Sequence, residues 1–301
     1  MKKIRPMLAS SVKDEKLELL WKKLDWFCEE KVDGSRYVLQ FDFEGKPCLT
    51  SRRISVKTNK PVEKTDNLRG YVCLAIPGLA DTVLDGEIVG GESFSETVKL
   101  MGSSPDKAQA LLKDGYKVRY IVYDILEYKG EDLRDTELYV RKKVLEKVVR
   151  QMNNPYIELV REFDNKKESY EEVVAEGGEG IILKYARSVY SEALRSKEWV
   201  KVKKTITEEG VIMDMAEGSG KYEGNLGALK VGQFFGDELK EVASISGMSD
   251  AERRDFWDNK KAYLAEATTV EFSAQEKTKA RYRHPQFVRL RPDKSPIECR
   301  F

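Results

Sequence analysis

Short apolar strands separated by turns are the feature that most constrains how this 301-residue chain folds. Residues 37–43 alternate apolar side chains with other residues at a period of two, which is the pattern of a half-buried strand. A turn at Glu44-Gly45 leads into a returning strand at residues 47–51. Further short strands are predicted at residues 82–89, 119–126, 180–184 and 199–203. Because these antiparallel hairpins are mixed with helices, the sequence predicts an α+β protein rather than a wound parallel sheet.

Helices are predicted between these strands at residues 14–24, 104–113 and 136–152. The first would place Leu17, Leu20 and Leu24 on one face. The second begins with Ser104-Pro105, where serine caps the helix and proline takes its first position.

The pattern of predicted elements changes after Thr205. Strands are predicted at residues 211–215, 228–235 and 242–245, followed by one helix with the capping box Ser249-x-x-Glu252. Short strands with a single helix fit a small β-barrel of the OB-fold type. We therefore expect two domains, residues 1–205 and 206–301, joined by a short linker.

Composition excludes several kinds of chemistry. The four cysteines show no C-x-x-C spacing and are too few for a disulfide scaffold, and His284 is the single histidine. A histidine-rich zinc site or a Ser-His-Asp triad is therefore not expected, and catalysis must depend on carboxylates, lysines or a metal held by oxygen. No run approaches the ~20 apolar residues that span a bilayer, so we expect a cytoplasmic protein without a membrane partner.

The sharpest motif is Lys31-Val32-Asp33-Gly34-Ser35-Arg36, which follows an apolar strand. A lysine amine is a nucleophile only when it is neutral, and from a pKa of ~10.4 neutrality at pH 7 costs about 4–5 kcal/mol. Neighbouring cations or a metal would lower that pKa. The alternative interpretation of this motif is a surface hairpin with an Asp-Gly turn.

Four further segments place polar groups in apolar strands. Asp85 and Glu87 are separated by one residue, so both carboxylates lie on one face of their strand. Tyr123-Asp124 puts an aromatic residue before an acid, and a glycine turn precedes Glu179. Lys201 and Lys203 share a face and repel each other unless an anion lies between them; a solvated strand face is the alternative for that pair.

In this order, the five segments resemble the motifs of the covalent nucleotidyltransferases, which are DNA ligases, RNA ligases and mRNA capping enzymes. Ser51-Arg52 resembles a further motif of that superfamily. Residues 218–230 look like the first hairpin of the OB domain of ATP-dependent DNA ligases, and residues 283–294 resemble their closing motif. The chain is thus similar to minimal two-domain ATP-dependent DNA ligases of viral or phage type, with a nucleotidyltransferase (adenylation) domain followed by an OB-fold.

The resemblance implies a reaction and a set of residues. Lys31 would attack the α-phosphate of ATP to give lysyl-AMP, and the AMP would pass to the 5′-phosphate of a nick before the 3′-hydroxyl seals the strand. Lys201 and Lys203 would hold the α-phosphate, and Glu87 and Glu179 would hold Mg²⁺, or Mn²⁺ in its place. The remaining ATP contacts implied are Glu29 to the adenine amine, Tyr123 stacked on adenine, Arg36 or Glu87 to the ribose, Arg52 to phosphate, and Arg291, with Asp293 and Lys294, to pyrophosphate.

The partner implied is nicked double-stranded DNA, bound by a monomer without an obligatory protein partner. Residues 277–294 carry seven basic residues against Asp293 alone, a charge of +6 that predicts phosphate contacts. The predicted DNA contacts are Arg52, Arg53, Arg281, Arg283, Arg289 and Lys294. DNA replication, recombination and repair are the roles that the family suggests.

Two rival hypotheses remain open at this point. An RNA ligase or a GTP-using capping enzyme shares the lysine motif. A nucleic-acid-binding protein with an inactive nucleotide site is the non-enzymatic alternative, and the presence of Lys31, Glu179, Lys201 and Lys203 argues against it.

Overall fold

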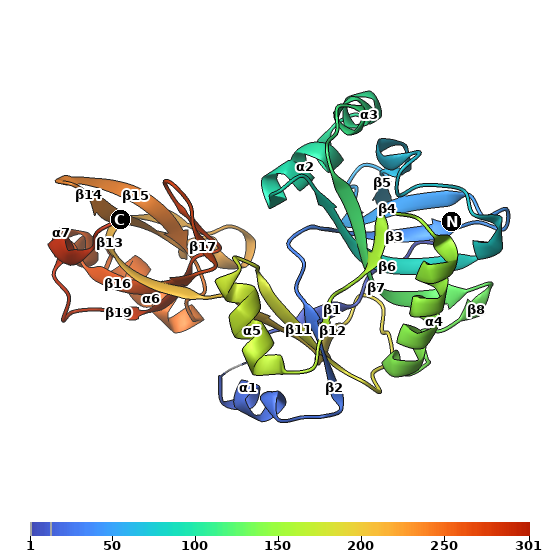
Figure 1. The fold of residues 1–301 in the computed structure, drawn as a ribbon. Coiled ribbons are helices and arrows are strands. Elements are labelled where there is room, and N and C mark those ends of the chain that lie inside the picture. The colour runs from blue at the N-terminus through green and yellow to red at the C-terminus, as the bar shows by residue number, and fades with distance from the viewer. Residues whose placement is uncertain (1, 13) are drawn as a thin grey trace. The chain divides into compact units, whose positions relative to one another are not determined.

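The computed structural model describes residues 2–12 and 14–301 of the chain. The chain divides into two compact units, one reaching to Lys203 and the other spanning Lys204–Phe301 (Figure 1). None of the described helices has the length and apolar character needed to cross a bilayer.

Two β-sheets build the first unit. The smaller has the strand order β1 (Leu8–Ser10), β12 (Arg195–Lys203), β11 (Gly180–Tyr185), β2 (Trp26–Glu30), β10 (Glu162–Phe163). The larger has the order β5 (Pro61–Glu63), β4 (Pro47–Ile54), β3 (Ser35–Phe41), β6 (Thr82–Gly90), β7 (Val118–Tyr128), β8 (Glu131–Asp132), with β9 (Ile157–Leu159) also paired to β7. Apart from β1–β12 and β7–β9, these pairings are antiparallel, so the predicted α+β class is confirmed.

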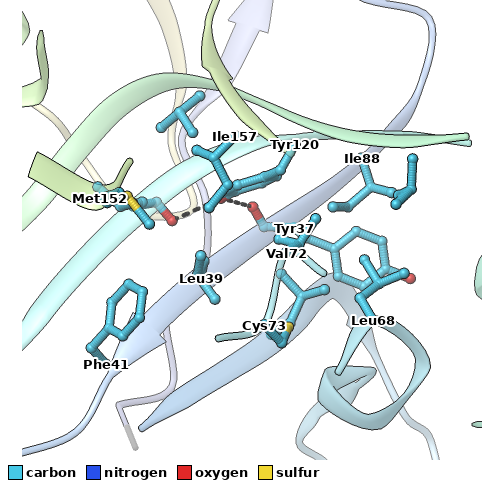
Figure 2. Close-up of a cluster of buried hydrophobic side chains, with 14 of the residues drawn as sticks. Tyr37, Leu39, Phe41, Leu68, Val72, Cys73, Ile88, Tyr120, Met152 and Ile157 are labelled. Atoms are coloured by element: carbon cyan, nitrogen blue, oxygen red, sulfur yellow. Dashed lines mark hydrogen bonds between the residues drawn. The ribbon is translucent and has the colours of Figure 1, made fainter. Parts of the chain in front are cut away.

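The larger sheet has buried side chains on both faces. On one face of β3, Tyr37, Leu39 and Phe41 enter the main core of the unit, where Tyr120 donates a hydrogen bond to the Tyr37 carbonyl over 2.9 Å (Figure 2). On the other face, Val38 belongs to a second cluster with residues of the smaller sheet. The prediction of a half-buried strand at residues 37–43 was therefore wrong, because the second sheet covers the face that was expected to meet solvent.

The helices of the first unit are α1 (Asp14–Trp21), α2 (Phe94–Gly102), α3 (Pro105–Lys113), α4 (Leu138–Met152) and α5 (Lys166–Ala175). Helix α1 ends at Trp21, so Leu24 lies outside it and is 98% exposed, contrary to the predicted apolar face. Helix α3 begins after Ser104 as predicted. The sequence patterns did not predict α2 or α5.

The second unit is an OB-fold barrel with the strand order β15 (Glu238–Ile245), β14 (Leu226–Phe235), β13 (Ile206–Glu217), β16 (Thr269–Ala274), β19 (Gln286–Leu290). The barrel closes where the Phe287 N–H donates to the Ser246 carbonyl over 2.7 Å. The predicted capping box of Ser249 and Glu252 starts helix α6 (Asp250–Asp258). A second helix, α7 (Lys260–Ala265), follows, so the prediction of a single helix was wrong. The remaining short elements are the strands β17 (Glu276–Lys277) and β18 (Tyr282–Arg283) and the 3₁₀ turns Thr65–Leu68, Pro77–Leu79, Gly220–Tyr222 and Pro296–Glu298.

Candidate active site

Lys31 lies in the connection that leaves β2 of the smaller sheet and enters β3 of the larger one. Its N–H donates to the Gly180 carbonyl over 2.9 Å, so the backbone at Lys31 still follows β11. Three residues later the chain passes against β6, where a Cβ on Gly34 would lie 2.4 Å from the Ile88 carbonyl oxygen. Glycine is thus required in this motif for close backbone approach, and the connection places Lys31 where the two sheets meet.

Glu179 joins Lys31 to Lys203. One oxygen of the carboxylate pairs with the Lys31 ammonium and the other lies 2.6 Å from the Lys203 ammonium. Burial raises the pKa of Glu179, but the attraction of the two lysines more than offsets this, and the pKa is held below its usual value. Gly180 fixes the entry to β11 with a φ of +132°, and a Cβ there would lie 2.1 Å from the Val202 carbonyl oxygen.

Lys201 lies on β12 two residues before Lys203, and within the described part of the chain it makes no ion pair. Burial lowers its pKa, and the nearby cations Lys203, Arg195 and Lys31 lower it further. The sequence predicted two lysines that repel each other beside an anion site, and the structure brings Lys201, Lys203 and Lys31 into one cationic cluster. An anion bound among them relieves the repulsion.

Arg36, Asp85 and Tyr190 form a buried network on the other side of the site. Two guanidinium nitrogens of Arg36 donate to Asp85 over 2.9 and 2.5 Å, a third donates to the Met7 carbonyl over 2.6 Å, and the Tyr190 hydroxyl donates to Asp85 over 2.6 Å. Asp85 is fully buried and satisfied by protein groups. Its carboxylate therefore positions Arg36.

Glu87 pairs in register with Arg36 across β3 and β6, and its side chain is half-buried. Burial raises its pKa to about 7, with Lys31 and Arg36 opposing the shift and Asp85 and Glu179 adding to it. No group of three or more potential metal-ligating side chains occurs among the described residues. Two neighbouring carboxylates nevertheless fit Mg²⁺, which is commonly bound by one or two carboxylates together with substrate phosphates.

Tyr123 marks a separate end of the site. Its half-buried ring contacts Trp199 edge-on with 6.4 Å between centroids, and the Lys184 ammonium and the Arg36 guanidinium lie 4.6 and 5.5 Å from the ring centroid. The adjoining Asp124 points elsewhere, into a fully buried ion pair with Arg141.

Glu29 is 1% exposed, and both of its oxygens are paired. One lies 2.5 Å from the Lys142 ammonium and the other 2.5 Å from the Lys184 ammonium. A carboxylate oxygen has two acceptor sites, so each keeps one site beyond the lysine it binds.

Arg52 and Arg53 lie apart from this cluster, on β4, and both are exposed. Lys57 and Lys60 follow in the loop between β4 and β5, and residues 51–62 contain no acid. Within the described chain none of these four cations makes an ion pair, so the hairpin keeps its full positive charge.

The basic segment of the second unit behaves differently. Arg291 contacts three carboxylates, those of Glu209 at 2.5 Å, Asp293 at 2.9 Å and Glu271 at 3.2 Å. The other predicted cations also have acidic neighbours: Arg281 with Glu241, Arg283 with Glu276, Arg289 with Glu271, and Lys294 with Glu298. The predicted excess of +6 over residues 277–294 is thus largely neutralised, because neighbouring strands of the barrel supply acids that a count along the sequence omits.

The sequence-based search missed Lys142, Arg141, Lys184 and Tyr190. A signal was present for the first two, because the buried face of α4 is spaced as 138, 141, 142, 145, 148 and 152, and cations occupy two positions where apolar residues are expected. Lys184 is the next-to-last residue of β11, in which it is the one charged residue, and nothing in the sequence marked Tyr190.

Comparison with known proteins places this site in a family. The sequence profile described as "ATP dependent DNA ligase domain" matches residues 6–203, and the chain belongs to that family. It is 28% identical to DNA ligase 2 of Korarchaeum cryptofilum over 83% of this chain and 44% of that protein. It is 27% identical to the DNA ligase of Ignicoccus hospitalis over 98% of this chain and 58% of that one.

The chain therefore spans about half the length of these curated relatives. Among solved structures, one from a structure-function study of DNA binding by Lig E DNA ligases superposes with a TM-score of 0.67 at 22% identity. That match covers 95% of this chain and 99% of the other, so the two share the fold of both units.

Proposed function

We propose that this protein is an ATP-dependent DNA ligase that joins the 3′-hydroxyl and 5′-phosphate ends of a nick through a lysyl-AMP intermediate. The observation that carries the proposal is the cluster in which Lys31 and Lys203 share Glu179 beside Lys201. A lysine nucleophile within a cationic cluster, in a chain of the ATP-dependent DNA ligase family, suits attack on a phosphate.

In the first step, the Lys31 amine attacks the α-phosphorus of ATP. A P–N bond forms, the P–O bond to pyrophosphate breaks, and the amine loses a proton. Lys201 and Lys203 hold the α-phosphate oxygens, and Glu179 orients the amine. Catalysis of this kind consists mainly of positioning and charge neutralisation, which the lysine cluster supplies.

Glu87 and Glu179 are the carboxylates that would hold Mg²⁺, and the bound metal would neutralise charge on the departing pyrophosphate. The raised pKa of Glu87 agrees with a carboxyl group that gains from a nearby cation. Arg36, fixed by Asp85, would contact the ribose, Tyr123 would stack on adenine, and Glu29 would accept from the adenine amine.

The exposed β4–β5 hairpin supports nicked duplex DNA as the partner. Arg52, Arg53, Lys57 and Lys60 keep their charge there, and contacts to the phosphate backbone need such cations. In the second unit, Arg281, Arg283, Arg289 and Lys294 would contact DNA only by exchanging their acidic neighbours for phosphates, and Arg291 would do the same for pyrophosphate. We further propose a cytoplasmic monomer of two domains that seals nicks left by replication, recombination or repair.

Two assays test the proposal. Incubation with α-labelled ATP and Mg²⁺ is expected to give an acid-labile, alkali-stable adduct that is absent from Lys31→Ala and present in the matched control Lys143→Ala, an exposed lysine of α4. Labelling by GTP in place of ATP would indicate a capping-type enzyme.

The second assay compares a nicked DNA duplex with a nicked RNA duplex. Sealing of the DNA nick supports the proposal, whereas sealing of RNA alone would make the protein an RNA ligase. Tight nick binding by a protein that forms no adduct would favour the non-enzymatic alternative.

A further inference from the structure

Glu29, Lys142 and Lys184 form a buried ionic triad whose cations come from different elements. Lys184 belongs to β11, whereas Lys142 reaches Glu29 from helix α4, 113 residues away in sequence. Lys142 is 5% exposed and Lys184 is 1% exposed. Lys142 also pairs with Glu162 at 2.7 Å, so the cluster brings two lysines together with two carboxylates.

A buried ionic triad of this kind contributes little net free energy to folding. Removing ionic groups from water costs several kcal/mol each, and apolar side chains of similar volume often serve as well or better. The triad instead keeps Glu29 in its ionised form. Burial raises the pKa of Glu29, yet the two lysines more than offset this and hold the pKa below its usual value.

The position of the triad connects it to the nucleotide site. The Lys184 ammonium that binds Glu29 also lies 4.6 Å from the centroid of the Tyr123 ring. Glu29 itself is two residues before Lys31 and is the next-to-last residue of β2. A purine stacked on Tyr123 would therefore meet the acceptor sites of Glu29 that the lysines leave open.

We propose that Lys142 is a positioning residue for nucleobase selection, because it fixes Glu29 as an ionised carboxylate that accepts a hydrogen bond and donates none. An acceptor of this kind takes the 6-amino group of adenine and repels the 6-oxo group of guanine. A neutral carboxylic acid in the same place would donate to the oxo group and lose the distinction. This inference rests on the proposed function, since it concerns the triphosphate that Lys31 attacks.

The test measures kcat/KM of adduct formation with ATP and with purine riboside triphosphate, which lacks only the 6-amino group. In the wild-type protein, a hydrogen bond to a charged group is expected to make kcat/KM about 10- to 100-fold higher for ATP than for purine riboside triphosphate. In Lys142→Met we expect the ratio to fall to about 3-fold or less and labelling by GTP to rise. The neighbouring Lys143→Met, which changes an exposed lysine of the same helix, is expected to keep the wild-type ratio.

A purely structural role for Lys142 would lower adduct formation with both triphosphates by the same factor, so an unchanged ratio in Lys142→Met overturns the proposal. If thermal melting shows that this variant is unfolded, the same kcat/KM ratio is measured in Lys142→Gln, which removes the charge but keeps a polar group. Glu29→Gln is expected to lower the ratio equally, and combining it with Lys142→Gln is expected to lower it no further. Failure of the proposed function looks different, because the wild-type protein would then form no adduct with any triphosphate.

Discussion

Neutralising two lysines of the β4–β5 hairpin is expected to weaken DNA binding in a way that depends on salt. Lys57 and Lys60 are exposed and without ion-pair partners in the described chain, so Lys57→Gln/Lys60→Gln removes two free positive charges. Each phosphate contact contributes about −0.9 to the slope of log K against log salt concentration. Losing two contacts therefore makes the slope shallower by about 1.8 and weakens binding by about 30-fold at 0.15 M salt, falling to about 3- to 4-fold at 0.5 M.

Fluorescence anisotropy with a labelled nicked duplex measures this effect. A dideoxy 3′ end blocks sealing, so the dissociation constant is read from 0.05 to 0.5 M KCl without turnover. The matched control is Lys143→Gln/Lys147→Gln, which removes two exposed lysines from α4. Adduct formation with ATP is measured in parallel and is expected to stay unchanged in both variants. Parallel slopes for the hairpin variant and the wild-type protein would refute the argument that the hairpin contacts phosphates.

Further outcomes are expected at the site and in the core. Lys203→Ala should lower adduct formation about 100-fold without changing the melting temperature by more than a few degrees, because a preorganised cation facing the phosphate is lost; normal labelling would remove Lys203 from the α-phosphate site. Because burial raises the pKa of Glu87 to about 7, protons compete with Mg²⁺ below that pH. The Mg²⁺ concentration for half-maximal adduct formation should therefore rise as the pH falls through 7, whereas in Glu87→Gln this rise should disappear. The same raised pKa means that Glu87 favours the folded state most fully below pH 4.5, and this contribution to the free energy of unfolding is lost as the pH rises through 7. Asp124→Asn leaves the fully buried Arg141 cation without its carboxylate partner, which should lower the free energy of unfolding in urea titrations by about 3–5 kcal/mol. A loss below about 1 kcal/mol would contradict the described pairing.

Local patterns in the sequence were enough to predict the fold class, the strands that carry the motifs and the capping box of α6. These features depend on period-two alternation and on turn and cap residues that lie close together in the chain. The prediction failed for segments that lack such local patterns. Helices α2 and α5 were not predicted, and Leu24 was assigned to a helix that ends three residues earlier.

The partners of charged groups were the part that sequence could not supply. Asp85 was visible as a buried acid, but its hydroxyl partner Tyr190 lies 105 residues away. Arg291 appeared as part of a cationic stretch, although β13 and β16 provide carboxylates from positions 82 and 20 residues earlier. Pairing across strands is set by tertiary packing, so a charge counted along the chain differs from the charge that a ligand meets.

The strand order of the smaller sheet has a consequence for the time at which the protein becomes active during synthesis. Strand β12, which carries Lys203, lies between β1 and β11 in this sheet. Lys203 shares Glu179 with Lys31 but is synthesised 172 residues after Lys31. At about 5–20 residues per second, a ribosome makes Lys203 about 10 to 35 s after Lys31. A nascent chain that stops before β12 carries Lys31, the proposed nucleophile, but neither Lys201 nor Lys203, so we expect it to form no adduct with ATP.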